Sequence, residues 1–358
     1  MRANTTGSLH TAVGYQALSA NTTADSNTTV GYQSMLSTTT GNSNAALGLQ
    51  ALRETTTGSS NTAIGNQALF ANTTASNNTA VGASALVANT TGADNVAVGK
   101  DALESNTTGA ENTAVGSVAL DANTTGSYNT TVGYDSLSLN TTGASNTALG
   151  TSALQQNTTA SYNVAVGQQA LKLNTTGAQN TAVGYQALEA NTTGTKSVAV
   201  GTYALESATT GGYNTAVGNM ALASATTGAQ NTASGYYAGK NVTTGTYNCA
   251  YGYSALPSNT TASYNTAIGA HALETNTTGN ELVAVGYQAL YNNTTGSKNT
   301  GVGRKVMHSN TTGAENVAVG FNCLYYNSTG NYNTAMGRSA LETNTTGDEQ
   351  VAIGYECL

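Results

Sequence analysis

The side chains that could carry chemistry are few in this chain and lie far apart. Histidine occurs only at His10, His271 and His308 among 358 residues. No set of His, Cys, Asp and Glu has the spacing typical of a metal site, and no Ser-His-Asp set or pair of carboxylates recurs. We therefore expect no catalytic residue, no metal and no cofactor, and predict that the protein is not an enzyme.

A strict repeat must position the remaining side chains. A glycine recurs every 17 residues from Gly14 to Gly354, and no copy gains or loses a residue. The unit reads roughly N-T-A-V-G-Y-Q-A-L-x-x-N-T-T-G-x-x. A fixed period near 20 residues is typical of repeat proteins, in which each unit is completed by its neighbours. We therefore predict one repeat domain over residues 1–358, and we number the columns of the unit from this glycine, column 0.

The columns before the glycine predict a β-strand. Column −1 is Val, Ile or Leu in 18 of 21 copies, and column −3 is mostly Thr or Val. Such residues favour strands, and residues two apart share a face of a strand. We expect this face to point inward, with the Ala of column −2 close to another backbone or chain. With the Leu of column +4, the expected core comprises Val13, Leu18, Val183, Leu188, Val217, Leu222 and Tyr251.

The simplest fold with this period is all-β, a parallel β-solenoid (β-roll) of 21 coils with 17 residues per coil. Each coil would pair with the next at about 4.7–4.9 Å, so that equivalent residues stack into ranks. The recurrent glycine indicates a turn with positive φ, or a backbone too close for a side chain. Representative turn glycines are Gly14, Gly184, Gly201 and Gly354.

The charged residues give a map of the expected surface. All 27 fall in columns +1, +2, +5, +6, +11 and +12. Because unpaired charge is excluded from a packed interior, we expect the interior to be built from the other columns. The net charge of −7 disfavours phosphate binding, so we expect no nucleic-acid partner. No apolar run approaches the 18 or so residues of a membrane helix, so we expect no membrane insertion.

Asn and Thr recur in columns −4 and +7 to +9, and the N-T-T runs match the N-glycosylation acceptor at 16 positions of column +7. Glycans on successive coils would start about 4.8 Å apart, too close for every acceptor to be occupied. We therefore expect stacked ladders of side chains, while sparse glycosylation stays open. The residues that represent the ladders are Asn174, Thr175, Thr176 and Asn180.

The repeat is weakest near residues 231–257. Column −1 becomes Ser234 and column +4 becomes Gly239, which removes two expected core side chains from one coil. In the next coil column −1 becomes Tyr251. We hypothesise that Tyr251 fills the space left by Ser234 and Gly239. Replacing Tyr251 with Val would then destabilise the protein by about 2–4 kcal/mol.

Tyr is the main surface aromatic residue and recurs in columns +1 and +12. Stripes of Tyr can stack on sugars or pack against a partner chain, or they can stack across coils and stiffen the protein. The sequence leaves both alternatives open. The residues expected to make surface contacts, with a cell-surface glycan or receptor as partner, are Tyr128, Tyr162, Tyr213 and Tyr264.

The strand motif resembles that of a known family. Residues 163–167 read N-V-A-V-G, residues 197–201 read S-V-A-V-G and residues 351–354 read V-A-I-G, which is similar to the head repeat of YadA-like trimeric autotransporter adhesins. The longer unit at residues 180–188, N-T-A-V-G-Y-Q-A-L, resembles repeats of bacteriophage-type tail-fibre proteins. The resemblance implies a parallel β-roll, often trimeric, used as a rigid stalk or host-contacting fibre. The 17-residue unit is longer than the adhesin head repeat.

These patterns predict a structural fibre or adhesin shaft, extracellular, on a cell surface or on a virion, which presents a binding surface on a rigid rod. Its partner would be itself, as the homotrimer that the resemblance implies or as a head-to-tail polymer. One alternative is a monomeric solenoid that polymerises head to tail into an extracellular filament, because terminal coils are unpaired strand edges. Another is an ice-binding protein, which would need two outward Thr ranks two residues apart, whereas columns +7 and +9 offer Asn and Thr.

Overall fold

The computed structural model describes residues 3–357, whose regular elements are short β-strands joined by turns, without a helix. The chain divides into two units, Met1–Gln179 and Asn180–Leu358, which are described separately. Within the described residues, the first unit has ten strands: β1 (Thr11–Val13), β2 (Thr28–Val30), β3 (Ala45–Leu47), β4 (Thr62–Ile64), β5 (Thr79–Val81), β6 (Val96–Val98), β7 (Thr113–Val115), β8 (Thr130–Val132), β9 (Thr147–Leu149) and β10 (Val164–Val166). The second has eleven: β11 (Thr181–Val183), β12 (Val198–Val200), β13 (Thr215–Val217), β14 (Thr232–Ser234), β15 (Cys249–Tyr251), β16 (Thr266–Ile268), β17 (Val283–Val285), β18 (Thr300–Val302), β19 (Val317–Val319), β20 (Thr334–Met336) and β21 (Val351–Ile353).

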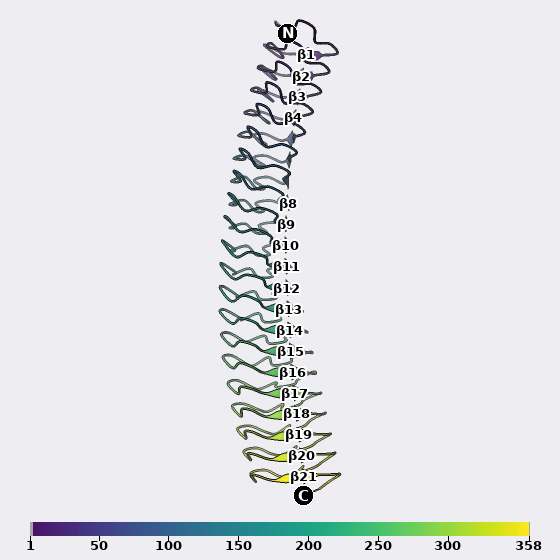
Figure 1. Ribbon diagram of the computed structural model, residues 1–358, viewed down its shortest axis with the longest axis vertical. Helices are drawn as coiled ribbons and strands as arrows, with labels where there is room; N and C mark the ends of the chain where they lie inside the picture. The colour runs from purple at the N-terminus through teal and green to yellow at the C-terminus, as the bar shows by residue number, and fades with distance from the viewer. Residues whose placement is uncertain (1–2, 358) are drawn as a thin grey trace. The chain divides into compact units, whose positions relative to one another are not determined.

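Within each unit, every strand pairs in parallel with the next strand along the chain, and Figure 1 shows the coils stacked accordingly. In the first unit Val13 of β1 lies beside Val30 of β2, and in the second Ala182 of β11 lies beside Ala199 of β12. These partners are 17 residues apart, so equivalent residues of successive coils are in register. The predicted parallel β-solenoid with 17-residue coils is confirmed, and one domain over residues 1–358 stays a prediction.

Hydrogen bonds between coils continue beyond the three-residue strands. After the strand, the backbone N–H of Gly31 donates to the carbonyl oxygen of Val13 at 2.9 Å. In the following turn, the N–H of Leu18 donates to the carbonyl oxygen of Ser34 at 3.2 Å. Because the turns are hydrogen-bonded to neighbouring coils as well as the strands, an inserted residue would leave backbone groups without partners. This accounts for the constant length of the unit.

The prediction that columns −3 and −1 face inward is wrong. The Val13 side chain is 57% exposed and that of Val217 is 41% exposed, whereas Val183 is half-buried. The Ala of column −2 points inward instead, and Ala182 is fully buried. The alternation along the strand is as predicted, but its two faces are exchanged.

The narrow interior of a coil decides which strand face points inward. The Leu rank of column +4 fills this interior, as expected: Leu18 and Leu188 are fully buried and Leu222 is 1% exposed. The facing column −2 holds only small side chains, Ala in most coils, and its largest members, Thr29 and Thr131, are fully buried. Larger strand side chains must therefore point outward.

Three residues in most coils adopt positive φ although they are not glycine. After Gly14 they are Gln16 (φ 55°), Leu18 (φ 49°) and Ser26 (φ 58°), and columns +2, +4 and +12 repeat the pattern along the chain. The left-handed conformation costs an L-residue roughly 1–2 kcal/mol. Each coil therefore stores strain that packing against its neighbours must offset. Turn prediction relies mainly on Gly and Asn, so it does not identify these positions, which hold other residues in most coils.

The recurrent glycine has both properties expected of it. Gly14, Gly184, Gly201 and Gly354 have φ values between 131° and 140°. A Cβ atom on Gly184 would lie 2.5 Å from the carbonyl oxygen of Gly201 in the next coil. A side chain in column 0 would therefore have neither a favourable backbone conformation nor space.

Candidate interaction surfaces

The three histidines lie in different coils and share no site. His10 Nε2 lies 3.2 Å from Asn21 Nδ2, and His271 Nδ1 lies 3.0 Å from Glu274 Oε2. His308 lies between two Tyr rings. Residues 3–357 contain no group of three His, Cys, Asp or Glu side chains placed to hold a metal ion.

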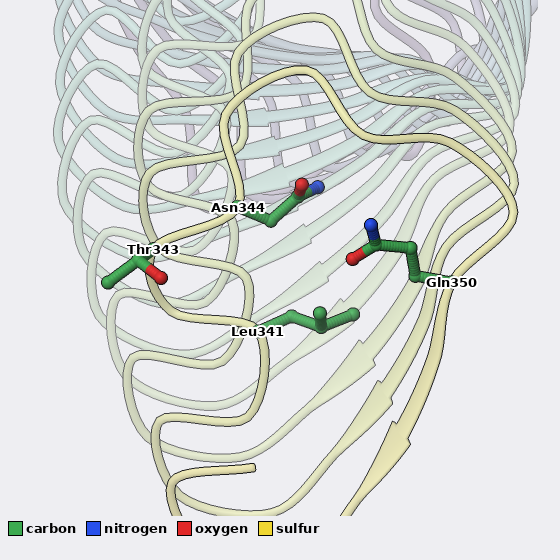
Figure 2. Close-up of a pocket in the computed structure, with 4 residues that line it drawn as sticks. All are labelled: Leu341, Thr343, Asn344 and Gln350. Atoms are coloured by element: carbon green, nitrogen blue, oxygen red, sulfur yellow. The ribbon is translucent and has the colours of Figure 1, made fainter. Parts of the chain in front are cut away.

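A pocket of about 280 Å³ opens at the last coil that the structure describes. It is lined by Leu341, Thr343, Asn344 and Gln350. Figure 2 shows the side chains of Leu341, Asn344 and Gln350 pointing into the space that the coil encloses, whereas Thr343 points away from it. Two amides and an aliphatic side chain supply no nucleophile and no charged group, so this pocket offers no chemistry for catalysis.

The Asn residues of column +7 form a buried ladder. Asn106 Nδ2 donates to Asn89 Oδ1 and to the carbonyl oxygen of Gly109, both at 2.9 Å. Asn123 repeats the bond to the rung before it at 2.8 Å. Asn89, Asn106 and Asn123 are fully buried. A glycan on the Nδ2 atom of these acceptors is therefore incompatible with the folded coil.

Asn174 and Asn180 belong to two different ladders. Asn174, in column +7, donates from Nδ2 to Asn157 Oδ1 at 2.9 Å. Asn180, in column −4, accepts the backbone N–H of Ser197 on its Oδ1 at 2.9 Å. One ladder thus runs from amide to amide, and the other ties each amide to the backbone of the next coil.

The two Thr residues of each N-T-T run differ in environment. In column +8 the hydroxyl donates to the next coil, as from Thr158 Oγ1 to the carbonyl oxygen of Thr175 at 3.2 Å. Thr176, in column +9, is exposed, as are the other Thr residues of this column. Column +9 is Thr in all 21 copies, whereas columns +1 and +12, which are exposed in most coils, vary widely.

The outward strand face, which we define as the side chains of columns −3 and −1 within one unit, combines an aliphatic rank in column −1 with a mostly Thr rank in column −3. In the first unit Val13, Leu47 and Ile64 are 57%, 51% and 41% exposed. None of the 27 charged residues lies in these columns. Column −1 is aliphatic in all ten strands of the first unit, whereas column −3 is Thr in seven of them. Ten strands about 4.8 Å apart, each three residues of about 3.3 Å, give this mixed face an area of roughly 500 Å². An exposed aliphatic rank along such a face often marks an interaction site.

The Tyr residues predicted as surface contacts are at the surface. The side chains of Tyr128, Tyr162, Tyr213 and Tyr264 are 56–64% exposed. Tyr264 stacks on Tyr247 of the preceding coil, with ring centroids 5.1 Å apart. Tyr213 lies beneath Lys196 Nζ, which is 5.2 Å from its ring centroid. Stacking across coils therefore occurs at Tyr264, and the exposed rings remain available for contacts.

The hypothesis that Tyr251 fills a core space is wrong, because its side chain is 58% exposed. Tyr251 belongs to the outward strand face, beside Ser234 of β14 and Ile268 of β16. Inside the coil, a Cβ atom on Gly239 would lie 2.9 Å from Leu222 Cδ2. The Leu side chain of the preceding coil therefore occupies the space beside Gly239.

Two ranks of rings and cations were not predicted from the sequence. In column +5, the His308 ring lies between Tyr291 and Tyr325, with centroid distances of 5.1 Å and 4.9 Å and nearly parallel planes. Burial in this stack, helped by the nearby charge of Lys305, lowers the pKa of His308. In column +1, cations alternate with rings over part of the second unit. The signal for both was the residue type at 17-residue intervals, read along one column.

Among the elements formed by residues 3–357, none is a helix with the length and apolar character that a bilayer span requires. Comparison with known proteins identifies no family, since no family model and no curated protein matches the sequence.

Proposed function

We propose that this protein is a structural, non-catalytic solenoid that associates with further copies of itself through the outward strand face, as a subunit of an extracellular or virion-surface fibre. The observation that carries this proposal is an aliphatic rank in contact with water. Val30, Leu47 and Val200 are exposed by 36–51%, whereas the Ala residues between the outward columns are buried. Covering such a rank removes apolar surface from water, which favours association.

A second copy of the same face suits this surface better than a charged partner. Columns −3 and −1 contain no charged residue, so an opposing charged side chain would be desolvated without compensation. The face repeats at the coil spacing, and two flat sheets can pack with interdigitated side chains at about 10 Å separation.

The resemblance of N-V-A-V-G at residues 163–167 to trimeric adhesin head repeats supports a trimer, an extracellular location and a role in host contact. Head-to-tail stacking is a competing mode of self-association, which would use the ends of the coils instead of the strand face.

Charge on the strand face tests the proposal. The variant Val30→Glu with Leu47→Glu places two carboxylates on the adjacent strands β2 and β3. The matched control, Ser26→Glu with Ser43→Glu, adds the same charge in column +12 of the same two coils. Four other coils already carry Glu in this column, at Glu111, Glu281, Glu315 and Glu349.

We expect the control to associate like the wild type in sedimentation velocity, and the strand-face variant to stay monomeric at the same concentrations. Far-UV circular dichroism establishes that both variants are folded. Equal association of the two variants would exclude the strand face as the interface.

Ice binding is a second candidate, for which the exposed Thr of column +9 supplies one of the two required outward Thr ranks in all 21 copies. This rank places hydroxyl and methyl groups at intervals of about 4.8 Å. An ice-recrystallisation assay decides between the candidates. Inhibition by the wild type that is lost when Thr91, Thr108 and Thr125 are replaced by Lys supports ice binding, and absence of inhibition rejects it.

A further inference from the structure

We infer that five residues of column +1 in the second unit form a binding strip for a carboxylated polysaccharide. This Arg–aromatic ladder consists of Tyr287, Arg304, Phe321, Arg338 and Tyr355, from successive coils. Arg304 Cζ lies 5.9 Å from the ring centroid of Tyr287 and 5.5 Å from that of Phe321. Arg338 Cζ lies 5.6 Å from the centroids of both Phe321 and Tyr355. Rings and cations therefore alternate along the ladder.

The ladder lies at the surface, and its cations are not neutralised by a neighbouring acid. Tyr287, Phe321 and Tyr355 are 45%, 36% and 63% exposed, and Arg304 and Arg338 are exposed as well. The ion pairs within residues 3–357 involve other cations. The charge of both guanidinium groups is therefore available to a ligand.

The stacking determines which atoms the ladder presents. Where a guanidinium lies over a ring, the faces of both groups are engaged. The edges of the rings and of the guanidinium groups are then the parts available to a ligand from solvent. The edge of an aromatic ring carries partial positive charge, and the edge of a guanidinium is a fork of N–H donors that matches a carboxylate. A row of such edges suits an extended anionic chain.

The spacing of the cations selects among anionic chains. Two coils separate Arg304 from Arg338, about 9–10 Å at the spacing of parallel strands. This length is comparable with the two-sugar repeat of an extended polysaccharide that has one carboxylate in each repeat. Column +2 places Lys305 next to Arg304 but Glu356 next to Tyr355, so the positive charge is confined to the middle of the ladder.

A nucleic acid fits this surface less well. It carries a phosphate on every nucleotide, and its binding needs clustered Lys and Arg. The protein has a net charge of −7, and the ladder offers two Arg residues on alternate rungs with Lys305 beside one of them. This inference goes beyond the proposed self-association and does not depend on it.

Binding of hyaluronan oligosaccharides to the full chain, measured by calorimetry, tests the inference. Hyaluronan has one carboxylate in each disaccharide. The variant Arg304→Gln with Arg338→Gln removes both cations of the ladder. The matched control, Lys196→Gln with Lys298→Gln, removes the same charge from exposed residues of column +12 in the same unit.

We expect the wild type and the lysine control to bind with an affinity that falls with salt. The affinity of the arginine variant for hyaluronan should be lower by roughly tenfold for each guanidinium removed. Replacing both Arg residues by Lys keeps the charge without the fork, and should restore binding only in part. Neutral dextran should not bind, and oligo-dT of equal charge should bind more weakly than hyaluronan.

Absence of hyaluronan binding by the wild type, an equal loss in the lysine control, or tighter binding of oligo-dT would each overturn the inference. Sedimentation of the arginine variant should match that of the wild type. This separates failure of the glycan strip from failure of the proposed self-association.

Discussion

Val306 occupies, inside its coil, the space beside the absent side chain of Gly301, since a Cβ atom on Gly301 would lie 3.0 Å from Val306 Cγ1. The two residues lie in columns −2 and +3, which are Ala in most coils. Where column −2 is Thr29, column +3 is Ser34, and the two hydroxyls are hydrogen-bonded, as in one other coil. Columns −2 and +3 therefore form a contact pair across the interior.

This pair predicts a coupled stability effect. Gly301→Ala should overpack the coil and cost about 1–3 kcal/mol. Val306→Ala should leave a cavity and cost a similar amount, about 1–3 kcal/mol. The double variant restores the Ala–Ala pair of most coils and should unfold at nearly the same urea concentration as the wild type. Additive losses in the double variant would show that the two residues are not in contact.

Interruptions of the Asn ladder in column +7 occur in consecutive coils. They are Thr38 and Thr55 in the first unit, and Ala208, Ala225 and Val242 in the second. Next to Thr38, the buried Oδ1 of Asn21 has no hydrogen-bond partner. An interruption therefore lowers stability at its ends, because consecutive replacements of Asn leave buried amide groups unpaired only where they adjoin the remaining Asn ladder.

We predict that removing a rung costs more inside the ladder than at its end. Asn123 Oδ1 accepts Asn140 Nδ2 at 2.9 Å, so Asn123→Ala leaves buried groups unpaired and should cost about 2–4 kcal/mol. Asn259 is the first Asn after the interruption that ends at Val242. On its other side, Asn276 Nδ2 donates to Asn259 Oδ1 at 3.5 Å. Asn259→Ala should therefore cost at least about 1 kcal/mol less. Urea midpoints of the two variants compare these losses, and equal midpoints would argue against the ladder as a source of stability.

Tyr251→Val should change stability by no more than about 0.5 kcal/mol, because Tyr251 is an outward residue without a core role. In the same coil, Leu256 is fully buried, and Leu256→Ala should cost about 2–5 kcal/mol. The melting temperatures of the two variants test this contrast. A large loss for Tyr251→Val would restore the core role that the sequence suggested.

Stability should fall at acid pH through His308. Burial between the two Tyr rings lowers its folded pKa below the ordinary 6.5, so the unfolded chain binds the proton more readily. The contribution of His308 is complete above pH 6.5 and is lost as the pH falls through the lowered folded pKa. His308→Phe keeps an aromatic ring between the two Tyr rings but removes the titrating group. The melting temperature of this variant should therefore depend less on pH between about 7 and 5 than that of the wild type. Identical pH profiles would exclude this role.

The period alone was enough to predict the fold, because a constant 17-residue unit allows few structures other than a solenoid. The inward face was predicted incorrectly, because alternation separates two faces without saying which is inward. The better signal was side-chain size. Column −2 never exceeds Thr, which indicates a narrow interior, whereas column −1 accepts Ser234, Tyr251 and Met336, as an exposed position does.

The surface ranks were harder to predict than the stacking of the Leu and Asn columns. The buried Leu and Asn columns are nearly constant, so their stacking is evident from the sequence. The Arg–aromatic ladder occupies a column that elsewhere holds Leu49, Ala83 or Ser117, and its alternation becomes meaningful only once adjacent coils are known to stack in register. The positive φ of Leu18 could not be predicted, since nothing in its residue type favours that conformation.

In the proposed function, the outward strand face is an interface between copies of this chain. Sedimentation equilibrium of the wild type over a wide range of concentrations tests it most directly. We predict a mass that rises to a fixed multiple of the chain mass as the aliphatic ranks become covered. A monomer at every concentration, or open-ended growth without a fixed multiple, would contradict it.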